Sequence, residues 1–108
     1  MATVAEINPQ ELKRRLDAGE SVTVLDVREP WECAIACLSG AIRIPLAEVP
    51  ARLGELNRAA ELIVMCKAGG RSRRAAEFLL SHGFSRVANL SGGIDAWTRE
   101  IDPTLAAY

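Results

Sequence analysis

One stretch decides the fold class of this 108-residue chain: Leu62-Ile-Val-Met-Cys66-Lys-Ala-Gly-Gly-Arg71-Ser72, followed by Arg73-Arg74-Ala-Ala-Glu-Phe-Leu-Leu80. Its first four residues are all apolar, which is typical of a short strand that is covered on both faces. From Arg71 onward the apolar residues return at helical spacing, and Gly83 fits the position just after a helix end. The stretch therefore predicts a strand, a glycine-rich loop and a helix, with Cys66 between the strand and the loop.

This position has a chemical consequence for Cys66. Gly69 and Gly70 permit positive φ and close backbone approach, so the loop can curl around something small. Free N–H groups along such a loop and at a helix start favour negative charge. Four cations lie nearby, at Lys67, Arg71, Arg73 and Arg74. We expect the thiol to ionise near neutral pH and to act as a nucleophile, the alternative being a buried, unreactive cysteine.

The composition is that of a globular protein, and we expect one domain over residues 1–108. Hydrophobic residues make up 49% and charged residues 25%, and the net charge of −1 gives no general reason to expect nucleic-acid or anionic-membrane binding. No apolar run approaches the roughly 20 residues that span a bilayer, and the N-terminus lacks the features of a secretory signal. Three cysteines are too few for a disulfide scaffold, so the expected location is the reducing cytoplasm.

Strands and helices alternate along the rest of the chain. The expected strands cover 3–7, 22–27, 41–44, 62–65 and 87–90. The expected helices begin at Pro9 and Pro30, cover 47–56, run from Arg71 to Gly83 and surround 94–97, and 102–108 is expected to be a loose tail. This alternation predicts an α/β fold, with a mostly parallel five-stranded sheet and helices on both faces. Sites in such sheets form beyond the carboxyl ends of the strands, where Asp26, Arg28, Cys66 and the Gly92-Gly93 turn would meet.

Several motifs together resemble a known family. They are Leu25-Asp26-Val27-Arg28-Glu29 with Glu32, Gly40-Ala-Ile-Arg-Ile-Pro45, the loop Cys66-Lys-Ala-Gly-Gly-Arg-Ser72, and Leu90-Ser-Gly-Gly-Ile94 with Trp97. The chain resembles a single-domain rhodanese, a sulfurtransferase that carries sulfur as a cysteine persulfide. The resemblance implies that Cys66 is the sulfur-bearing nucleophile and that a backbone cradle surrounds its outer sulfur. The cradle comprises Lys67, Ala68, Gly69, Gly70 and Arg71, with the arginine closing it.

The resemblance also implies supporting residues and a reaction. Asp26, Arg28 and Ser72 would brace the site, the first two through ion pairing that includes Glu32. Sulfur would pass from thiosulfate or a persulfide donor to a thiol, cyanide or protein acceptor, without a metal or organic cofactor. Lys67 and Arg71 would help to bind a dianionic donor.

Two other functions are alternatives to this one. A cysteine phosphatase or arsenate reductase has a Cys-x5-Arg loop, which would place arginine at 72, where this chain has Ser72. The shorter loop fits a single sulfur atom better than a tetrahedral oxyanion. A protein persulfide relay without turnover of small donors is the second alternative, and turnover with a small donor would distinguish it.

The chain departs from the family pattern at Ala36-Cys37-Leu38-Ser39, where Cys37 takes the place of a usual histidine. Cys33 and Cys37 do not have the usual spacing of zinc ligands, so two packed thiols are favoured. Cys37 is nevertheless a candidate resolving thiol for a Cys66 persulfide. The ending from Gly93 to Tyr108 is similar to rhodanese domains fused behind adenylating enzymes that activate ubiquitin-like sulfur carriers, which points to protein partners.

Overall fold

The computed structural model describes residues 3–108 and contains a five-stranded parallel sheet. Its strands are β1 (Ala5–Ile7), β2 (Val22–Asp26), β3 (Ile42–Arg43), β4 (Glu61–Met65) and β5 (Val87–Leu90). They lie in the order β1-β5-β4-β2-β3, and each neighbouring pair is parallel. The expected α/β class, the parallel sheet and the edge position of the first strand are confirmed.

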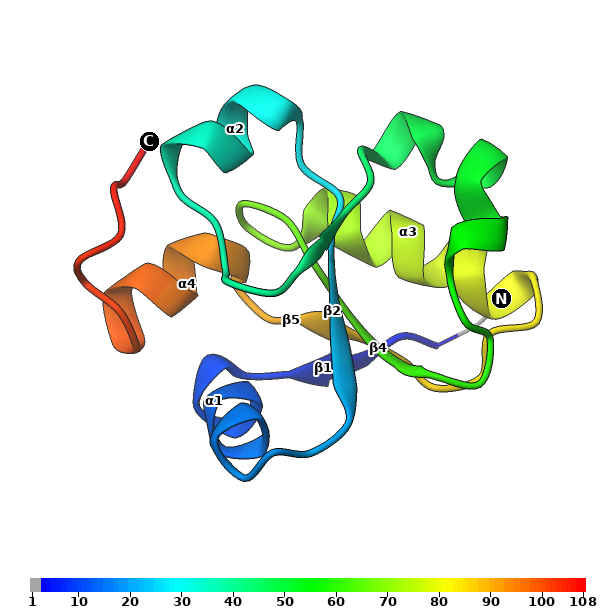
Figure 1. Cartoon of the computed structure of the whole chain (residues 1–108), viewed down its shortest axis with the longest axis horizontal. Coiled ribbons are helices and arrows are strands. Elements are labelled where there is room, and N and C mark those ends of the chain that lie inside the picture. The colour runs from blue at the N-terminus through cyan, green and yellow to red at the C-terminus, as the bar shows by residue number, and fades with distance from the viewer. Residues whose placement is uncertain (1–2) are drawn as a thin grey trace.

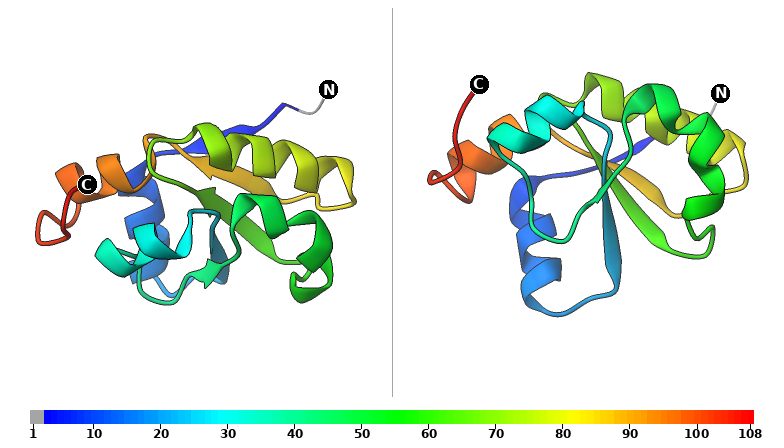
Figure 2. Two further views of the ribbon diagram at one scale, coloured as in Figure 1. Left: turned by 90° about the horizontal axis from the view of Figure 1, so that it is seen from above. Right: turned by 45° about the horizontal axis from the view of Figure 1, so that its top comes forward.

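Helices cover both faces of this sheet, as the alternation predicts. They are α1 (Pro9–Asp17), α2 (Pro30–Ile35), α3 (Gly70–Ser81) and α4 (Gly93–Glu100). Figures 1 and 2 show α1 and α4 on one side of the sheet and α3 on the other, while α2 lies beyond the carboxyl end of β2. Because the strands are parallel, the segments that follow them lie close together at one edge of the sheet.

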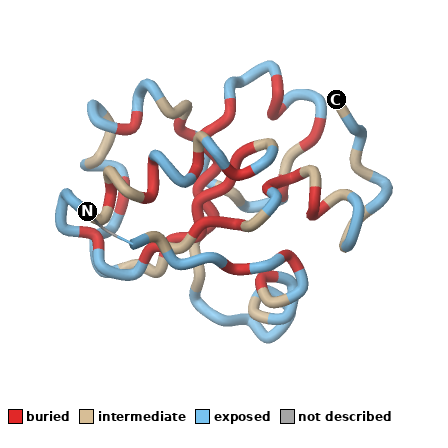
Figure 3. Tube along the Cα trace, turned by 180° about the vertical axis from the view of Figure 1, so that it is seen from behind, coloured by how far each residue is buried: buried red, intermediate tan, exposed pale blue. Residues whose placement is uncertain are grey.

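The central strand β4 explains why an uninterrupted apolar run forms a strand here. Leu62 and Val64 pack into one core cluster with residues of α3, while Ile63 and Met65 pack into a second cluster with residues of α1 and α4. Both faces of the strand are thus buried, and the buried residues concentrate at the centre of the molecule (Figure 3).

The starts of two helices follow the local sequence. Asn8 caps α1 by accepting a hydrogen bond from the Glu11 N–H at 2.8 Å, and Pro9 occupies the first turn. α2 begins with a capping box in which the Glu29 N–H donates to Glu32 Oε1 at 3.0 Å. This second cap fixes the position of the Glu32 carboxylate, which the site uses.

The predicted α-helix over 47–56 is wrong. The chain forms two 3₁₀ segments instead, Leu46–Glu48 and Pro50–Glu55, and Arg52 has a non-helical φ of −114°. Pro50 offers no backbone N–H and Gly54 weakens helical propensity, so a continuous series of i to i−4 hydrogen bonds does not form.

The predicted loose tail over 102–108 is also wrong. Leu105 and Tyr108 are partly buried against the core cluster on the α1 and α4 side of the sheet. The tail turns back after α4, and its end lies near α2 (Figures 1 and 2). Among residues 3–108, no helix combines the length and apolar character needed to cross a bilayer.

Candidate active site

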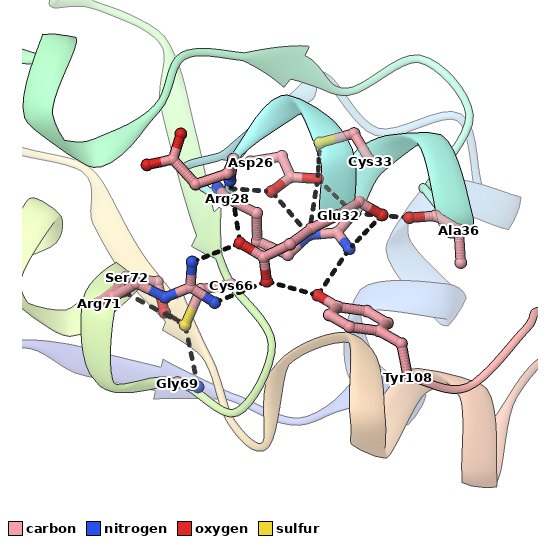
Figure 4. Close-up of polar contacts among 11 residues, drawn as sticks. Asp26, Arg28, Glu32, Cys33, Ala36, Cys66, Gly69, Arg71, Ser72 and Tyr108 are labelled. Atoms are coloured by element: carbon pink, nitrogen blue, oxygen red, sulfur yellow. Dashed lines mark hydrogen bonds and ion pairs between the residues drawn. The ribbon is translucent and has the colours of Figure 1, made fainter.

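Cys66 lies immediately after β4, at the carboxyl edge of the sheet, and only 1% of its surface is exposed. Its Sγ accepts hydrogen bonds from the Gly69 N–H at 3.1 Å and the Ser72 N–H at 3.4 Å, and lies 3.3 Å from Ser72 Oγ (Figure 4). The loop therefore directs backbone donors onto the sulfur, as predicted from its position before a helix. The prediction that Gly70 also needs a positive φ or a close backbone approach is wrong, because Gly70 is the first residue of α3 and a Cβ atom there would meet nothing within 4 Å.

Two glycines make this loop possible. Gly69 has a φ of +113°, which residues other than glycine rarely adopt. At Gly93 a Cβ atom would lie 2.4 Å from the Cys66 carbonyl oxygen and 2.5 Å from that of Lys67. The first turn of α4 approaches this closely because the Ile94 N–H donates to the Cys66 carbonyl at 2.9 Å.

Hydrogen bonds lower the pKa of Cys66. Burial raises the pKa of this thiol, but the Ser72 hydroxyl and the backbone N–H groups of Ser72, Gly69 and Ala68 favour the thiolate and outweigh burial. The direction agrees with the sequence prediction, and the cause is mainly local hydrogen bonding.

Three of the four cations that follow Cys66 have carboxylate partners, which corrects the expectation that they surround the thiol with positive charge. Lys67 pairs with Asp95 at 2.9 Å and Arg71 pairs with Glu32 at 2.6 Å. On the outer surface, Arg73 pairs with Glu6 at 3.0 Å. Each pair cancels much of the field that a free cation would exert at the sulfur.

Asp26 and Arg28 form an ion pair with fully buried side chains. The guanidinium Nη2 lies 2.7 Å from Asp26 Oδ2 and also donates to the Ala36 carbonyl at 2.8 Å (Figure 4). Burial lowers the pKa of Arg28, but its bonds to Asp26 and Tyr108 more than compensate, so the pKa lies above the usual value. This pair joins the end of β2 to α2.

Glu32 pairs with a different arginine from the one expected. Its carboxylate forms a bidentate pair with Arg71, at 2.6 Å and 2.9 Å, whereas Arg28 reaches only the Glu32 main-chain oxygen, at 3.4 Å. Arg71 lowers the pKa of Glu32 to about 2, opposed by burial and supported by bonds from Glu29 and Tyr108. The predicted inclusion of Glu32 in the Asp26–Arg28 pair is wrong, because the capping box of α2 directs its carboxylate toward α3.

Tyr108 is a site residue that the sequence reasoning missed. Its hydroxyl donates to Glu32 Oε2 at 2.7 Å and accepts from Arg28 Nη1 at 3.0 Å, and Lys67 Nζ lies 5.0 Å from its ring centroid. The tail therefore contacts the Asp26–Arg28 pair and the Arg71–Glu32 pair (Figure 4). The only signal in the sequence was an aromatic residue at the end of the 102–108 segment, and that segment has no helical or strand periodicity that would predict a buried side chain.

The other two cysteines do not contact the Cys66 sulfur. Cys33 is buried with its Sγ 3.5 Å from Asp26 Oδ2, and burial together with the Asp26 charge raises the pKa of its thiol. Cys37 lines a separate groove with Val24, Leu38 and Trp97. Its proposed role as a resolving thiol stays a prediction. Across residues 3–108, no three His, Cys, Asp or Glu side chains are grouped so that they could bind a metal ion.

Known proteins match this chain over most of its length. The sequence model of the rhodanese-like domain family matches residues 8–100. A sulfurtransferase from Allochromatium vinosum is 36% identical over 103 residues, which cover 95% of this chain and 96% of that protein. The adenylyltransferase and sulfurtransferase MOCS3-1 from Zea mays is 36% identical over 111 residues, and the match covers 96% of this chain but 24% of the longer relative.

Solved structures show the same fold. A rhodanese-like domain protein from Staphylococcus aureus superposes with a TM-score of 0.85 at 30% identity, covering 97% of this chain and 99% of that chain. A rhodanese-related protein from Thermoplasma volcanium gives a TM-score of 0.82 at 34% identity, covering 90% and 93%. The chain therefore belongs to the rhodanese-like domain family, the family of sulfurtransferases and sulfur carriers.

Proposed function

We propose that this protein is a sulfurtransferase in which Cys66 carries sulfane sulfur as a persulfide. The observation that supports this most strongly is the convergence of the Gly69 and Ser72 N–H groups on the Cys66 sulfur. A persulfide ends in an anionic sulfur, and fixed backbone donors around it stabilise that charge without reorganisation. The thiol with a lowered pKa supplies the nucleophile for loading.

The proposed reaction has two displacements at sulfur. The Cys66 thiolate attacks the outer sulfur of a donor such as thiosulfate, the donor S–S bond breaks, and sulfite leaves with the bonding electron pair. An acceptor thiolate or cyanide then attacks the outer sulfur of the Cys66 persulfide, and the cysteine leaves as a thiolate. The N–H groups of the 67–71 loop stabilise the outer sulfur between the two steps.

The charges at the site bear on which donors and acceptors fit. Lys67 and Arg71, which were expected to bind a dianion, are each paired with a carboxylate. A persulfide or thiol on a protein carries less charge than thiosulfate and needs less compensation. We therefore propose protein persulfides and thiols as donors and acceptors besides thiosulfate and cyanide, within a reducing compartment such as the cytoplasm.

The pairing of Arg71 also argues against the phosphatase alternative. A tetrahedral oxyanion needs an arginine that is free to bind two of its oxygens. Here both Nη atoms of Arg71 bond to Glu32 instead. The loop and its arginine thus favour sulfur chemistry over phosphoryl or arsenate chemistry.

The test is steady-state thiocyanate formation from thiosulfate and cyanide by the wild-type protein, Cys66→Ser and Cys37→Ser. We expect turnover by the wild type and Cys37→Ser, and none by Cys66→Ser. Turnover that persists in Cys66→Ser would overturn the proposal. Loading by a cysteine desulfurase combined with transfer only to a protein acceptor would identify the relay without small-molecule turnover.

A further inference from the structure

The Ser72 hydroxyl lies between two groups that both need its proton. Ser72 Oγ is 2.5 Å from Asn89 Oδ1 and 3.3 Å from Cys66 Sγ. Ser72 and Asn89 are both 0% exposed, so bulk solvent does not reach either side chain. A hydroxyl carries one proton and can donate to one of these acceptors at a time.

The orientation of the Asn89 amide is fixed by its other partners. Its Nδ2 lies 3.1 Å from the Gly69 carbonyl oxygen and 3.1 Å from Glu6 Oε2, and both of these oxygens can only accept. The nitrogen must therefore face them, and Oδ1 must face Ser72. Since Oδ1 cannot donate, a hydrogen bond between the two side chains uses the proton of the Ser72 hydroxyl.

The protonation state of Cys66 decides whether the Cys66 sulfur and Asn89 Oδ1 can both form a hydrogen bond with the Ser72 hydroxyl. A Cys66 thiol can donate its own proton to Ser72 Oγ while Ser72 donates to Asn89. A Cys66 thiolate has no proton to give and requires donors. The hydroxyl stabilises the thiolate only by rotating away from Asn89, which leaves a buried amide oxygen without a donor.

We propose that Asn89 is a positioning residue that competes with Cys66 for the Ser72 hydroxyl proton and so opposes formation of the thiolate. The proposal rests on the proposed function, in which Cys66 is the sulfur carrier. When a Cys66 persulfide gives its outer sulfur to an acceptor thiolate, the new S–S bond forms on the acceptor and Cys66 leaves as a thiolate. The Ser72 O–H then rotates toward the sulfur, and no proton is transferred.

Other charges near Cys66 remain in place when this pair is altered. On α3, Arg71 pairs with Glu32 of α2; at the loop, Lys67 pairs with Asp95 of α4; on β2, Asp26 pairs with Arg28; and on β1, Glu6 pairs with Arg73. Asn89→Leu also removes the Asn89 hydrogen bonds to Glu6, but it does so whether or not Ser72 is present. The effect of Asn89→Leu with Ser72 minus its effect without Ser72 therefore isolates the Ser72–Asn89 contact.

The test measures the pKa of Cys66 from the pH dependence of its alkylation by iodoacetamide, quantified on the Cys66 peptide by mass spectrometry. The proteins are the wild type, Ser72→Ala, Asn89→Leu and the double variant. Ser72→Ala should slow alkylation at neutral pH, and Asn89→Leu should accelerate it, each by about 3- to 10-fold, the size of one hydrogen bond. In the Ser72→Ala background, Asn89→Leu should change nothing.

This last comparison separates the proposed role from a structural one. Asn89 also bonds the Gly69 carbonyl, so a variant that merely distorts the loop would shift the Cys66 pKa equally with and without Ser72. Equal shifts in both backgrounds, or a raised pKa in Asn89→Leu alone, would overturn the proposal. Asn89→Ala repeats the test with a side chain that cannot overpack.

A measurement on the unaltered Asn89 covers the case in which its variants do not fold. In the wild type, the side-chain carbonyl ¹³C resonance of Asn89 should titrate with the Cys66 pKa, and in Ser72→Ala it should not. A wild-type resonance whose chemical shift does not change when Cys66 ionises would overturn the proposal. Because these readouts follow ionisation and not sulfur transfer, a failure to load sulfur would count against the proposed function alone.

Discussion

Cys66 has two contrasting neighbourhoods. On one side lies a charged cluster, formed by Asp26, Arg28, Glu32, Arg71 and Tyr108. On the other side Ser72 and Asn89 form an uncharged pair. No member of the charged cluster hydrogen-bonds to the Cys66 sulfur, whereas Ser72 does so through its backbone and lies beside it with its hydroxyl. The charged cluster therefore stabilises the walls of the site while its charges cancel, and the uncharged pair acts on the sulfur itself.

The largest expected effect comes from removing one member of the buried ion pair. Arg28→Met leaves the Asp26 carboxylate buried without its partner, which should lower the free energy of unfolding by about 3–5 kcal/mol. Chemical denaturation measures this, with Arg52→Met as the control, because Arg52 forms solvent-exposed pairs with Glu48 and Glu55 that contribute about 0–1 kcal/mol. Similar losses in the two variants would contradict a special role for the buried pair. Should Arg28→Met not fold, Arg28→Lys keeps the charge and tests the bidentate geometry.

The pH dependence of stability gives a second test of the charged cluster, through its Glu32 carboxylate. The pKa of Glu32 falls from 4.5 to about 2 on folding, so its contribution is fully present above pH 4.5 and is lost as pH falls toward 2. A shift of this size corresponds to a contribution on the order of 3 kcal/mol. The difference in unfolding free energy between wild type and Glu32→Gln should therefore be constant from pH 7 to about 5 and shrink below pH 4.5.

Using this difference removes the contributions of other carboxylates whose pKa values are also lowered, such as Glu6 and Glu61. A difference that stays unchanged down to pH 2.5, below the ordinary carboxylate range, would contradict the importance of the Arg71–Glu32 pair.

The smallest of these effects concerns the tail. Tyr108→Phe removes the hydroxyl that joins Arg28 and Glu32 but keeps the ring, and should cost about 1–2 kcal/mol of unfolding free energy. Tyr108→Leu removes the ring as well, including its contacts with Lys67 and Trp31, and should cost more. Thermal unfolding of both variants separates the two contributions. A Phe variant as stable as the wild type would show that the ring alone secures the tail.

Features with a local cause could be predicted from the sequence. The apolar run 62–65 indicates a strand because both its faces are buried, and Asn8 with Pro9 marks a helix start through its cap. The position of Cys66 followed from the order of strand, glycines and helix. The backbone donors that converge on the sulfur are a consequence of that same local order.

Pairings between distant residues could not be predicted in the same way. Arg71 and Glu32 are 39 residues apart, and Tyr108 lies 76 residues from Glu32. Four cations follow Cys66 and the chain has many carboxylates, so which pairs form depends on where the fold places α2, α4 and β1, which supply the three carboxylate partners. The expectations that unpaired cations surround the thiol and that the tail is loose failed for this reason, since both depend on contacts between residues that lie far apart in the sequence.

Sulfur transfer through Cys66 is tested most directly by the intact mass of the purified protein after incubation with thiosulfate, alongside Cys66→Ser. The wild type should gain the mass of one sulfur atom, cyanide should remove it, and Cys66→Ser should gain nothing. A sulfur adduct that survives in Cys66→Ser, or a wild type that gains no sulfur from either thiosulfate or a persulfide-loaded cysteine desulfurase, would contradict sulfur transfer through Cys66.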